Sequence, residues 1–138
     1  MTEPKRMIAA LDWTKAMCFT GGKPGGPQLS LDGDGVEAPS PIVALLCACA
    51  GCTGADIYSI LEKKRIKLTR FHTEVGGNRR EDYPRRFTEI WFRFTFAGEG
   101  LTEEAARRAV ELSLEKYCSV ILSLNPDIPI TWEIVIEA

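Results

Sequence analysis

The sequence lacks a strong excess of either charge, a long uncharged run and an N-terminal export signal. Its 17 basic and 19 acidic residues leave a net charge of −2, so we expect no general attraction to nucleic acid or to an anionic membrane. The longest uncharged run, residues 38–55, falls short of the ~20 apolar residues that cross a bilayer, and it predicts a buried helix instead. With no apolar leader and no cleavage pattern, the chain is expected to be cytoplasmic.

Histidine is nearly absent, and the number of cysteines is odd. Five cysteines in a cytoplasmic chain argue against a structural disulfide framework, so any disulfide is expected to be transient. Hydrophobic residues make up 45% of the chain and charged residues 26%, which is the balance of an ordinary globular protein. A chain of 138 residues buries one core but not two, so residues 1–138 are expected to form a single domain.

The apolar periodicities predict the order β-β-α-β-β-α-β, an α+β domain with mixed or antiparallel sheets. Ser40 followed by Pro41 is typical of a helix start, and Asn125-Pro126 ends the second helix. In the fourth strand Ile90 and three phenylalanines fall on one face. The predicted strands are 6–20, 29–32, 67–75, 87–97 and 128–136, and the predicted helices are 40–65 and 102–124.

The first predicted helix is apolar on every side until Asp56. A helix of this kind must be covered all round. In so small a domain, part of that cover is expected to come from a second subunit, which predicts a homodimer.

Three of the five cysteines fall within residues 47–52, and this cluster is open to a metal, a redox or a packing interpretation. Cys47 and Cys49 point roughly 160° apart on a helix and cannot grip one ion. The single histidine, His72, lies on a predicted strand, and no second cysteine pair completes a zinc site. We therefore expect no metal and no cofactor. For Cys18, Cys47 and Cys49 the favoured interpretation is that of small buried apolar side chains.

Cys52 differs from its neighbours in its flanks and in its possible partner. Gly51 and Gly54 remove side-chain bulk around it. Cys118 falls on the inward stripe of the second helix, with Val110, Leu114 and Ile121 or Leu122. If the two helices pack together, Cys52 and Cys118 form a dithiol able to cycle through a disulfide.

The sequence contains the blocks Ala38-Pro-Ser-Pro, Gly51-Cys-Thr, Asp56-Ile-Tyr-Ser-Ile-Leu, Arg79-Arg-Glu, Pro84-Arg, Phe87-Thr and residues 109–120. Together these blocks resemble the OsmC/Ohr superfamily of thiol-dependent organic hydroperoxide reductases, most closely its YhfA-like branch. The resemblance implies an OsmC-like fold, in which sheets wrap two central helices of an intertwined homodimer. It also implies a cytoplasmic stress-response peroxidase in which Cys52 is the peroxidatic and Cys118 the resolving cysteine, with an external dithiol as reductant.

The sequence departs from the peroxidase branches at the start of the first helix. There the family has a glutamate that holds a catalytic arginine, whereas Ile42 and Val43 follow Pro41 here. Arg80 and Arg85, in the loop before residue 87, are the first candidates to support Cys52 in place of the family's catalytic arginine. The alternative is that these arginines only form a solvated loop. Two other functions stay open: a non-enzymatic dimer that binds a small lipophilic or electrophilic molecule, and a structural dimer with inert thiols.

Overall fold

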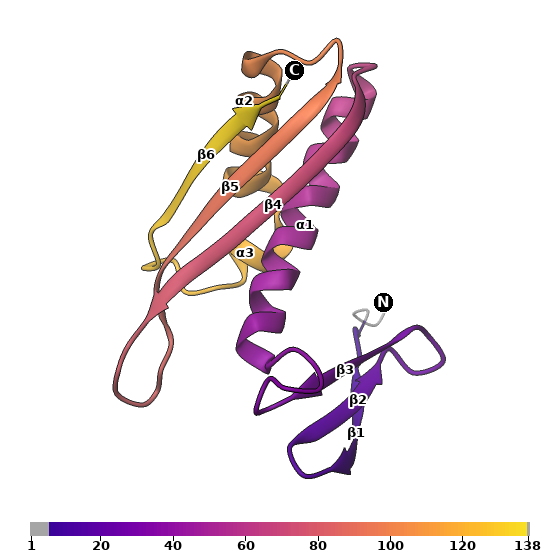
Figure 1. Ribbon diagram of the computed structural model, residues 1–138, viewed down its shortest axis with the longest axis vertical. Coiled ribbons are helices and arrows are strands. Elements are labelled where there is room, and N and C mark those ends of the chain that lie inside the picture. The colour runs from indigo at the N-terminus through magenta and orange to yellow at the C-terminus, as the bar shows by residue number, and fades with distance from the viewer. Residues whose placement is uncertain (1–5, 138) are drawn as a thin grey trace, which may run out of the picture. The chain divides into compact units, whose positions relative to one another are not determined.

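The computed structural model describes residues 6–137. The chain divides into two compact units, Met1–Leu45 and Leu46–Ala138, and we describe each by itself. That residues 1–138 form a single domain stays a prediction. The elements, labelled in Figure 1, are β1 (Ala10–Lys15), β2 (Cys18–Gly22), β3 (Gln28–Asp32), α1 (Pro41–Lys63), β4 (Lys67–Arg79), β5 (Phe87–Glu99), α2 (Glu103–Leu112), the π-helical turn η1 (Ser113–Tyr117), α3 (Ser119–Leu122) and β6 (Ile130–Ile136).

The first unit is built on an antiparallel three-stranded sheet in the order β1-β2-β3. The prediction of one strand over residues 6–20 is wrong, because the chain turns back at Ala16 and Met17. Ala16 takes a φ of 45°, a conformation that residues with a side chain seldom adopt. Its carbonyl accepts a hydrogen bond of 2.8 Å from the Trp13 indole. No glycine or proline marks this turn in the sequence.

The chain turns directly after β3, and Asp32 organises this turn. The buried Asp32 carboxylate accepts hydrogen bonds from the backbone N–H groups of Asp34, Val36 and Glu37 at 2.9, 3.2 and 3.0 Å. These bonds, that from Glu37 foremost, hold the pKa of Asp32 below its usual value. The charged Asp32 side chain therefore fixes the conformation of the loop that leads to α1.

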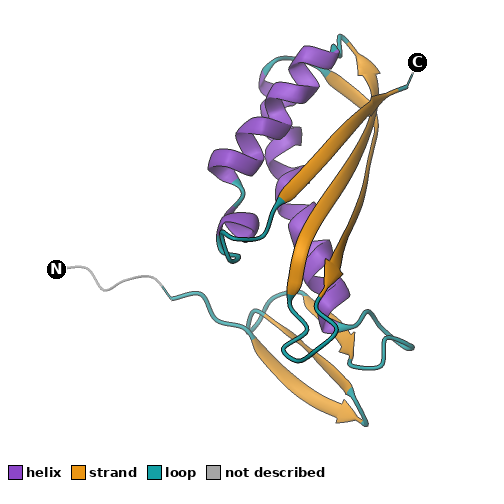
Figure 2. Ribbon diagram, turned by 90° about the vertical axis from the view of Figure 1, so that its left-hand side faces the viewer, coloured by secondary structure: helices purple, strands orange, loops and turns teal. Residues whose placement is uncertain are grey.

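The second unit contains a three-stranded sheet with helices on one face. β4 pairs with β5 antiparallel, and β5 pairs with β6 in parallel, as expected for a mixed sheet. Figures 1 and 2 show α1 and α2 on the same side of this sheet. The predicted inner face of β5 is confirmed, since its apolar side chains are at most 1% exposed: Ile90, Phe92, Phe94 and Phe96.

The apolar helix α1 begins as predicted, with Pro41 in first position and the Ser40 hydroxyl accepting from the Val43 N–H at 3.3 Å. By length and composition alone it could cross a membrane, a property that core helices of soluble proteins share. Only 17% of its most apolar window is buried within the chain. The expected burial on every side is thus not provided by a single copy of this chain.

The second predicted helix is not continuous. α2 starts as expected, with the Thr102 hydroxyl accepting from the Ala105 N–H at 3.1 Å. It then widens into η1, and Cys118 leaves helical geometry with φ −71° and ψ 101° before α3 begins. Because this stretch holds neither glycine nor proline, its sequence pattern is that of an uninterrupted helix.

Candidate active site

The fold of the second unit brings Cys52 and Cys118 together. Cys52 is half-buried on α1, whereas Cys118 is fully buried at the break between η1 and α3. Their sulfur atoms and a carboxylate oxygen of Asp56 all lie within 4.8 Å of one another. All five cysteines are free thiols. A disulfide bond of ~2.05 Å between Cys52 and Cys118 requires the two sulfurs to move closer.

The π-helical turn is what sets the position of Cys118. In η1 the Cys118 N–H donates to the Ser113 carbonyl at 2.7 Å, a bond across five residues. Ser113 and Cys118 both reach α1, through Asp56 and Thr53 respectively. The Cys118 sulfur then accepts the Ile121 N–H at 3.4 Å. Single π-helical turns inside α-helices occur frequently at functional sites.

Thr53 connects Cys118 to α1. The Thr53 hydroxyl donates to the Cys49 carbonyl at 2.8 Å and lies 3.4 Å from the Cys118 sulfur. Since the hydroxyl has a single proton, the Cys118 thiol is the donor of the second bond while Thr53 bonds to Cys49. Burial raises the pKa of Cys118. When Cys118 ionises, the Thr53 hydroxyl turns its proton to the thiolate, and this bond and that from the Ile121 N–H partly offset the increase.

Asp56 is the third member of the site, and it is not among the residues that the sequence predicted. Its Oδ2 accepts a hydrogen bond of 2.8 Å from the buried Ser113 hydroxyl. Asp56 follows Cys52 by four positions on α1, so the two lie on the same helix face. That spacing is readable from the sequence. The contribution of Ser113 is not, because it depends on how η1 packs.

A hollow of about 510 Å³ opens beside the cluster. Asp56 forms part of its wall, so the carboxylate connects the sulfur pair to an accessible space. The hollow combines apolar side chains with two ammonium groups. Its lining residues are Asp56, Ser59, Ile60, Lys63, Lys64, Leu112 and Tyr117.

The other three cysteines differ from one another in their exposure to solvent. Cys49 is fully buried, and burial raises its pKa to about 11, so its thiol is unreactive at neutral pH. Cys47 is exposed in the single chain, contrary to its predicted burial. Cys18 is half-buried and donates to the Glu37 carboxylate at 3.4 Å; burial and this bond raise its pKa.

Arg80 and Arg85 lie in the loop that joins β4 to β5, and both side chains are exposed. The Arg80 backbone N–H donates to the Arg86 carbonyl at 3.0 Å, and the Arg85 carbonyl accepts from Arg79 Nε at 2.7 Å. Within residues 6–137 no hydrogen bond joins either guanidinium to Cys52 or Cys118. A supporting role for these arginines stays a prediction.

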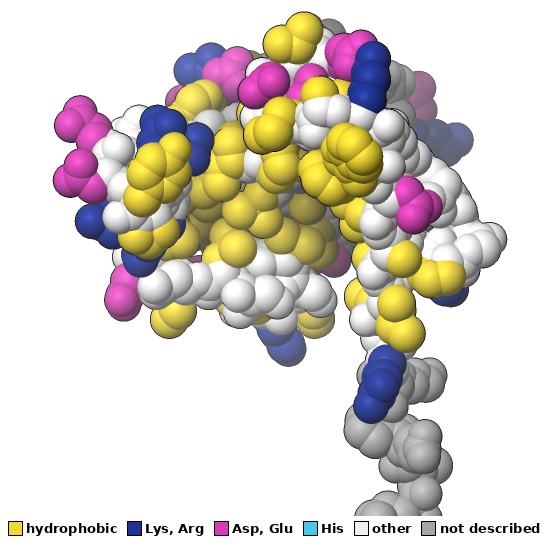
Figure 3. All heavy atoms as spheres, turned by 90° about the horizontal axis from the view of Figure 1, so that it is seen from below, with side chains coloured by type: hydrophobic (Ala, Val, Ile, Leu, Met, Phe, Trp, Pro, Cys, Tyr) yellow, Lys and Arg dark blue, Asp and Glu magenta, His cyan; other side chains and the backbone are white. Residues whose placement is uncertain are grey.

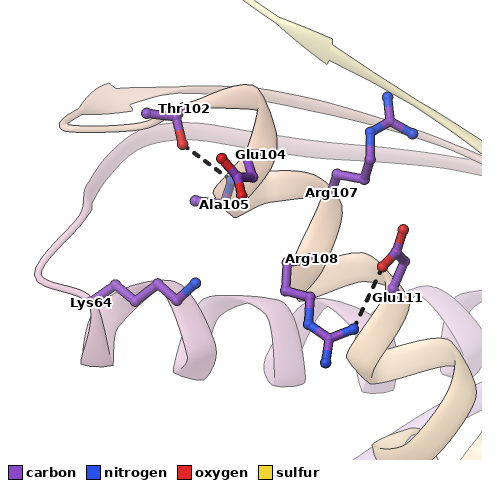
Figure 4. A pocket seen from close by; sticks show the side chains of 7 residues that line it. All are labelled: Lys64, Thr102, Glu104, Ala105, Arg107, Arg108 and Glu111. Atoms are coloured by element: carbon purple, nitrogen blue, oxygen red, sulfur yellow. Dashed lines mark hydrogen bonds and ion pairs between the residues drawn. The ribbon is translucent and has the colours of Figure 1, made fainter.

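A second hollow, of about 560 Å³, is lined mainly by charged side chains of α2 and by Lys64, which directly follows α1. In Figure 4 Arg108 turns toward Glu111, with which it forms an ion pair at 3.6 Å. No cysteine lines this hollow. It therefore offers charge but no nucleophile, and we assign it no part in the chemistry below.

In the first unit, Cys18, Asp32 and Glu37 also place a thiol and two carboxylates close together. The Asp32 carboxylate is already occupied by backbone N–H groups, and Glu37 pairs with the Lys15 ammonium at 2.9 Å. These contacts account for the group without a metal ion. The absence of a metal centre stays a prediction.

The chain is similar in sequence and in structure to several known proteins. Residues 32–133 match the family model described as OsmC-like protein. Protein YhfA of Escherichia coli is 40% identical over 126 residues, which cover 91% of this chain and 94% of YhfA. The OsmC-like protein of Mycoplasma pneumoniae superposes with a TM-score of 0.82 at 16% identity, over 99% of this chain and all of that one. The organic hydroperoxide resistance protein OhrB of Bacillus subtilis superposes with a TM-score of 0.60 at 14% identity, over 93% of this chain and 98% of OhrB.

Proposed function

Because this chain belongs to the OsmC-like family, we propose that it is a thiol-dependent peroxidase that reduces organic hydroperoxides through Cys52 and Cys118. The observation that carries the proposal is the cluster of two free sulfurs and one carboxylate within 4.8 Å. Cys52 is half-buried, whereas Cys118 is fully buried, so Cys52 is the cysteine that we expect a substrate to reach.

The proposed cycle has three balanced steps. The Cys52 thiolate attacks one oxygen of the O–O bond, becomes a sulfenic acid and releases an alkoxide that leaves as the alcohol after protonation. The Cys118 thiol then condenses with the sulfenic acid to a disulfide, and water leaves. An external dithiol reduces the disulfide by two thiol exchanges and is itself oxidised to a disulfide.

Ile60, Leu112 and Tyr117 line the hollow beside the cluster, and these side chains favour an alkyl hydroperoxide over hydrogen peroxide as the substrate. We expect weak to moderate turnover of an alkyl hydroperoxide with a dithiol reductant, and slower turnover of hydrogen peroxide. The rate is limited because Ile42 and Val43 stand where the family has a glutamate, so the Cys52 thiolate lacks the arginine that this glutamate holds. A coupled assay of peroxide loss with both substrates measures the ratio, and no reaction with any alkyl hydroperoxide refutes the proposal.

We propose a homodimer as the working form. Each unit leaves large apolar side chains exposed in a single copy, among them Trp13 at 65% and Leu29 at 54% in the first unit and Tyr58 at 53% in the second. Figure 3 shows hydrophobic side chains gathered in the middle of the view drawn there. Large exposed apolar surface is typical of association sites.

Light scattering on the purified chain at micromolar concentration should therefore give twice the mass of one copy. Replacing Val43 or Tyr58, both exposed on α1, by aspartate should shift the population toward monomer, because a charge would then enter an apolar contact. A replacement of exposed Glu62 by glutamine is the matched control. A well-folded wild-type monomer would contradict the dimer.

A second function is a non-enzymatic dimer that binds a small lipophilic or electrophilic molecule. The hollow beside Asp56, with Ile60, Leu112 and Tyr117 in its wall, favours it, as does the missing glutamate. Binding of a hydrophobic alkyl compound without any consumption of hydroperoxide would select this function over the peroxidase.

A further inference from the structure

Disulfide formation between Cys52 and Cys118 requires a proton transfer that the two cysteines cannot carry out by themselves. The condensation removes the Cys118 proton and adds a proton to the hydroxyl that leaves Cys52. Cys118 is fully buried, so bulk water does not reach its thiol directly. Burial also raises its pKa, which keeps the thiol protonated at neutral pH. A nearby base is needed.

Asp56 is placed to be that base. A carboxylate oxygen of Asp56 lies within 4.8 Å of both sulfurs, a gap that one water molecule or the oxygen of a sulfenic acid on Cys52 spans. The Ser113 hydroxyl holds Oδ2 at 2.8 Å. Among the described residues, Oδ1 has no hydrogen-bond partner and is free to accept a proton.

We propose that Asp56 is a catalytic proton carrier: it accepts the Cys118 thiol proton as the S–S bond forms and delivers it to the departing hydroxyl of Cys52, which leaves as water. This role rests on the proposed peroxidase function. The atoms balance, since one thiol and one sulfenic acid give one disulfide and one water. When a dithiol attacks the disulfide, the Asp56 carboxylate takes up the proton of the attacking thiol and passes it to the Cys118 thiolate that is released.

The surroundings of Asp56 support exchange of that proton with solvent. Asp56 is half-buried and lines the hollow of about 510 Å³, whereas Cys118 lines neither of the two hollows described above. The carboxylate is therefore the group through which protons pass between the buried sulfur and water. Thr53 does not replace it, because its hydroxyl is bonded to the Cys49 carbonyl and is not a base at neutral pH.

The replacement Asp56→Asn tests the proposal, because it keeps the shape and an oxygen acceptor for Ser113 but cannot take up the proton. Stopped-flow mixing with one equivalent of alkyl hydroperoxide should show Cys52 sulfenic acid, trapped with dimedone, forming at the wild-type rate. The following disulfide should form on the order of 100-fold more slowly. Exposed Asp82 replaced by asparagine is the matched control and should leave both steps unchanged.

A second measurement separates proton transfer from a structural role. In Asp56→Ala, added formate should restore part of the disulfide-forming rate, because a small carboxylate can enter the vacated space. Disulfide formation at the wild-type rate in Asp56→Asn overturns the proposal. So does an equal slowing of both steps without rescue by formate.

A separate readout does not require peroxidase activity. The Cys52–Cys118 disulfide can be made with diamide, and its reduction by dithiothreitol should be about tenfold slower in Asp56→Asn. A wild type that forms no sulfenic acid with any hydroperoxide refutes the peroxidase function, but this exchange rate still tests Asp56. An unchanged exchange rate refutes the role of Asp56 alone.

Discussion

Replacing Cys52 by serine should reduce hydroperoxide consumption to the uncatalysed background. The reaction needs a thiolate that becomes a sulfenic acid, and a serine hydroxyl neither ionises at neutral pH nor accepts the oxygen atom. Because Cys52 is only half-buried, serine fits its place with little cost in stability. Peroxide loss with an alkyl hydroperoxide and a dithiol measures the effect, and circular dichroism checks the fold.

Cys47→Ser is the matched control, since Cys47 lies on the same helix five positions earlier and is exposed. It should retain the wild-type rate. Full activity in Cys52→Ser would remove Cys52 from the chemistry and leave the binding function as the explanation of the site.

Replacing Cys118 by serine should leave one oxidation event per subunit but stop dithiol-driven cycling. The first step needs only Cys52, so one equivalent of hydroperoxide is consumed and the sulfenic acid accumulates. Without Cys118 no internal disulfide forms, and the external dithiol loses its substrate. The measurements are the stoichiometry of peroxide loss and the mass of the dimedone adduct at Cys52.

In the wild type, mild oxidation with hydroperoxide followed by peptide mapping should recover two peptides joined by a Cys52–Cys118 disulfide. Cys18, Cys47 and Cys49 should stay unpaired; Cys49 in particular carries a thiol whose pKa is about 11. A dominant Cys49–Cys52 bridge, or unchanged cycling in Cys118→Ser, would contradict the assignment of the resolving cysteine.

Much of the fold follows from local patterns that the sequence displays directly. The period-two pattern of β5, the cap at Ser40 with Pro41, and the cap at Thr102 each act through neighbours in the chain, so they are readable without tertiary information. The α+β class and the mixed sheet follow from the same elements. The turn at Ala16 was not readable, because it uses a strained alanine in place of glycine or proline.

The candidate site, too, was predictable from the sequence only in part. The sequence by itself placed Cys52 between two glycines on the first predicted helix and Cys118 on the inward stripe of the second, and the resemblance to a known family named them as a pair. Only the tertiary structure decided that Ser113–Tyr117 would form a π-helical turn, that Cys118 would leave the helix, and that Asp56 would join the two sulfurs. The physical reason is that these features depend on contacts between α1 and η1 across more than fifty residues, such as Ser113 with Asp56, and no local propensity encodes such contacts.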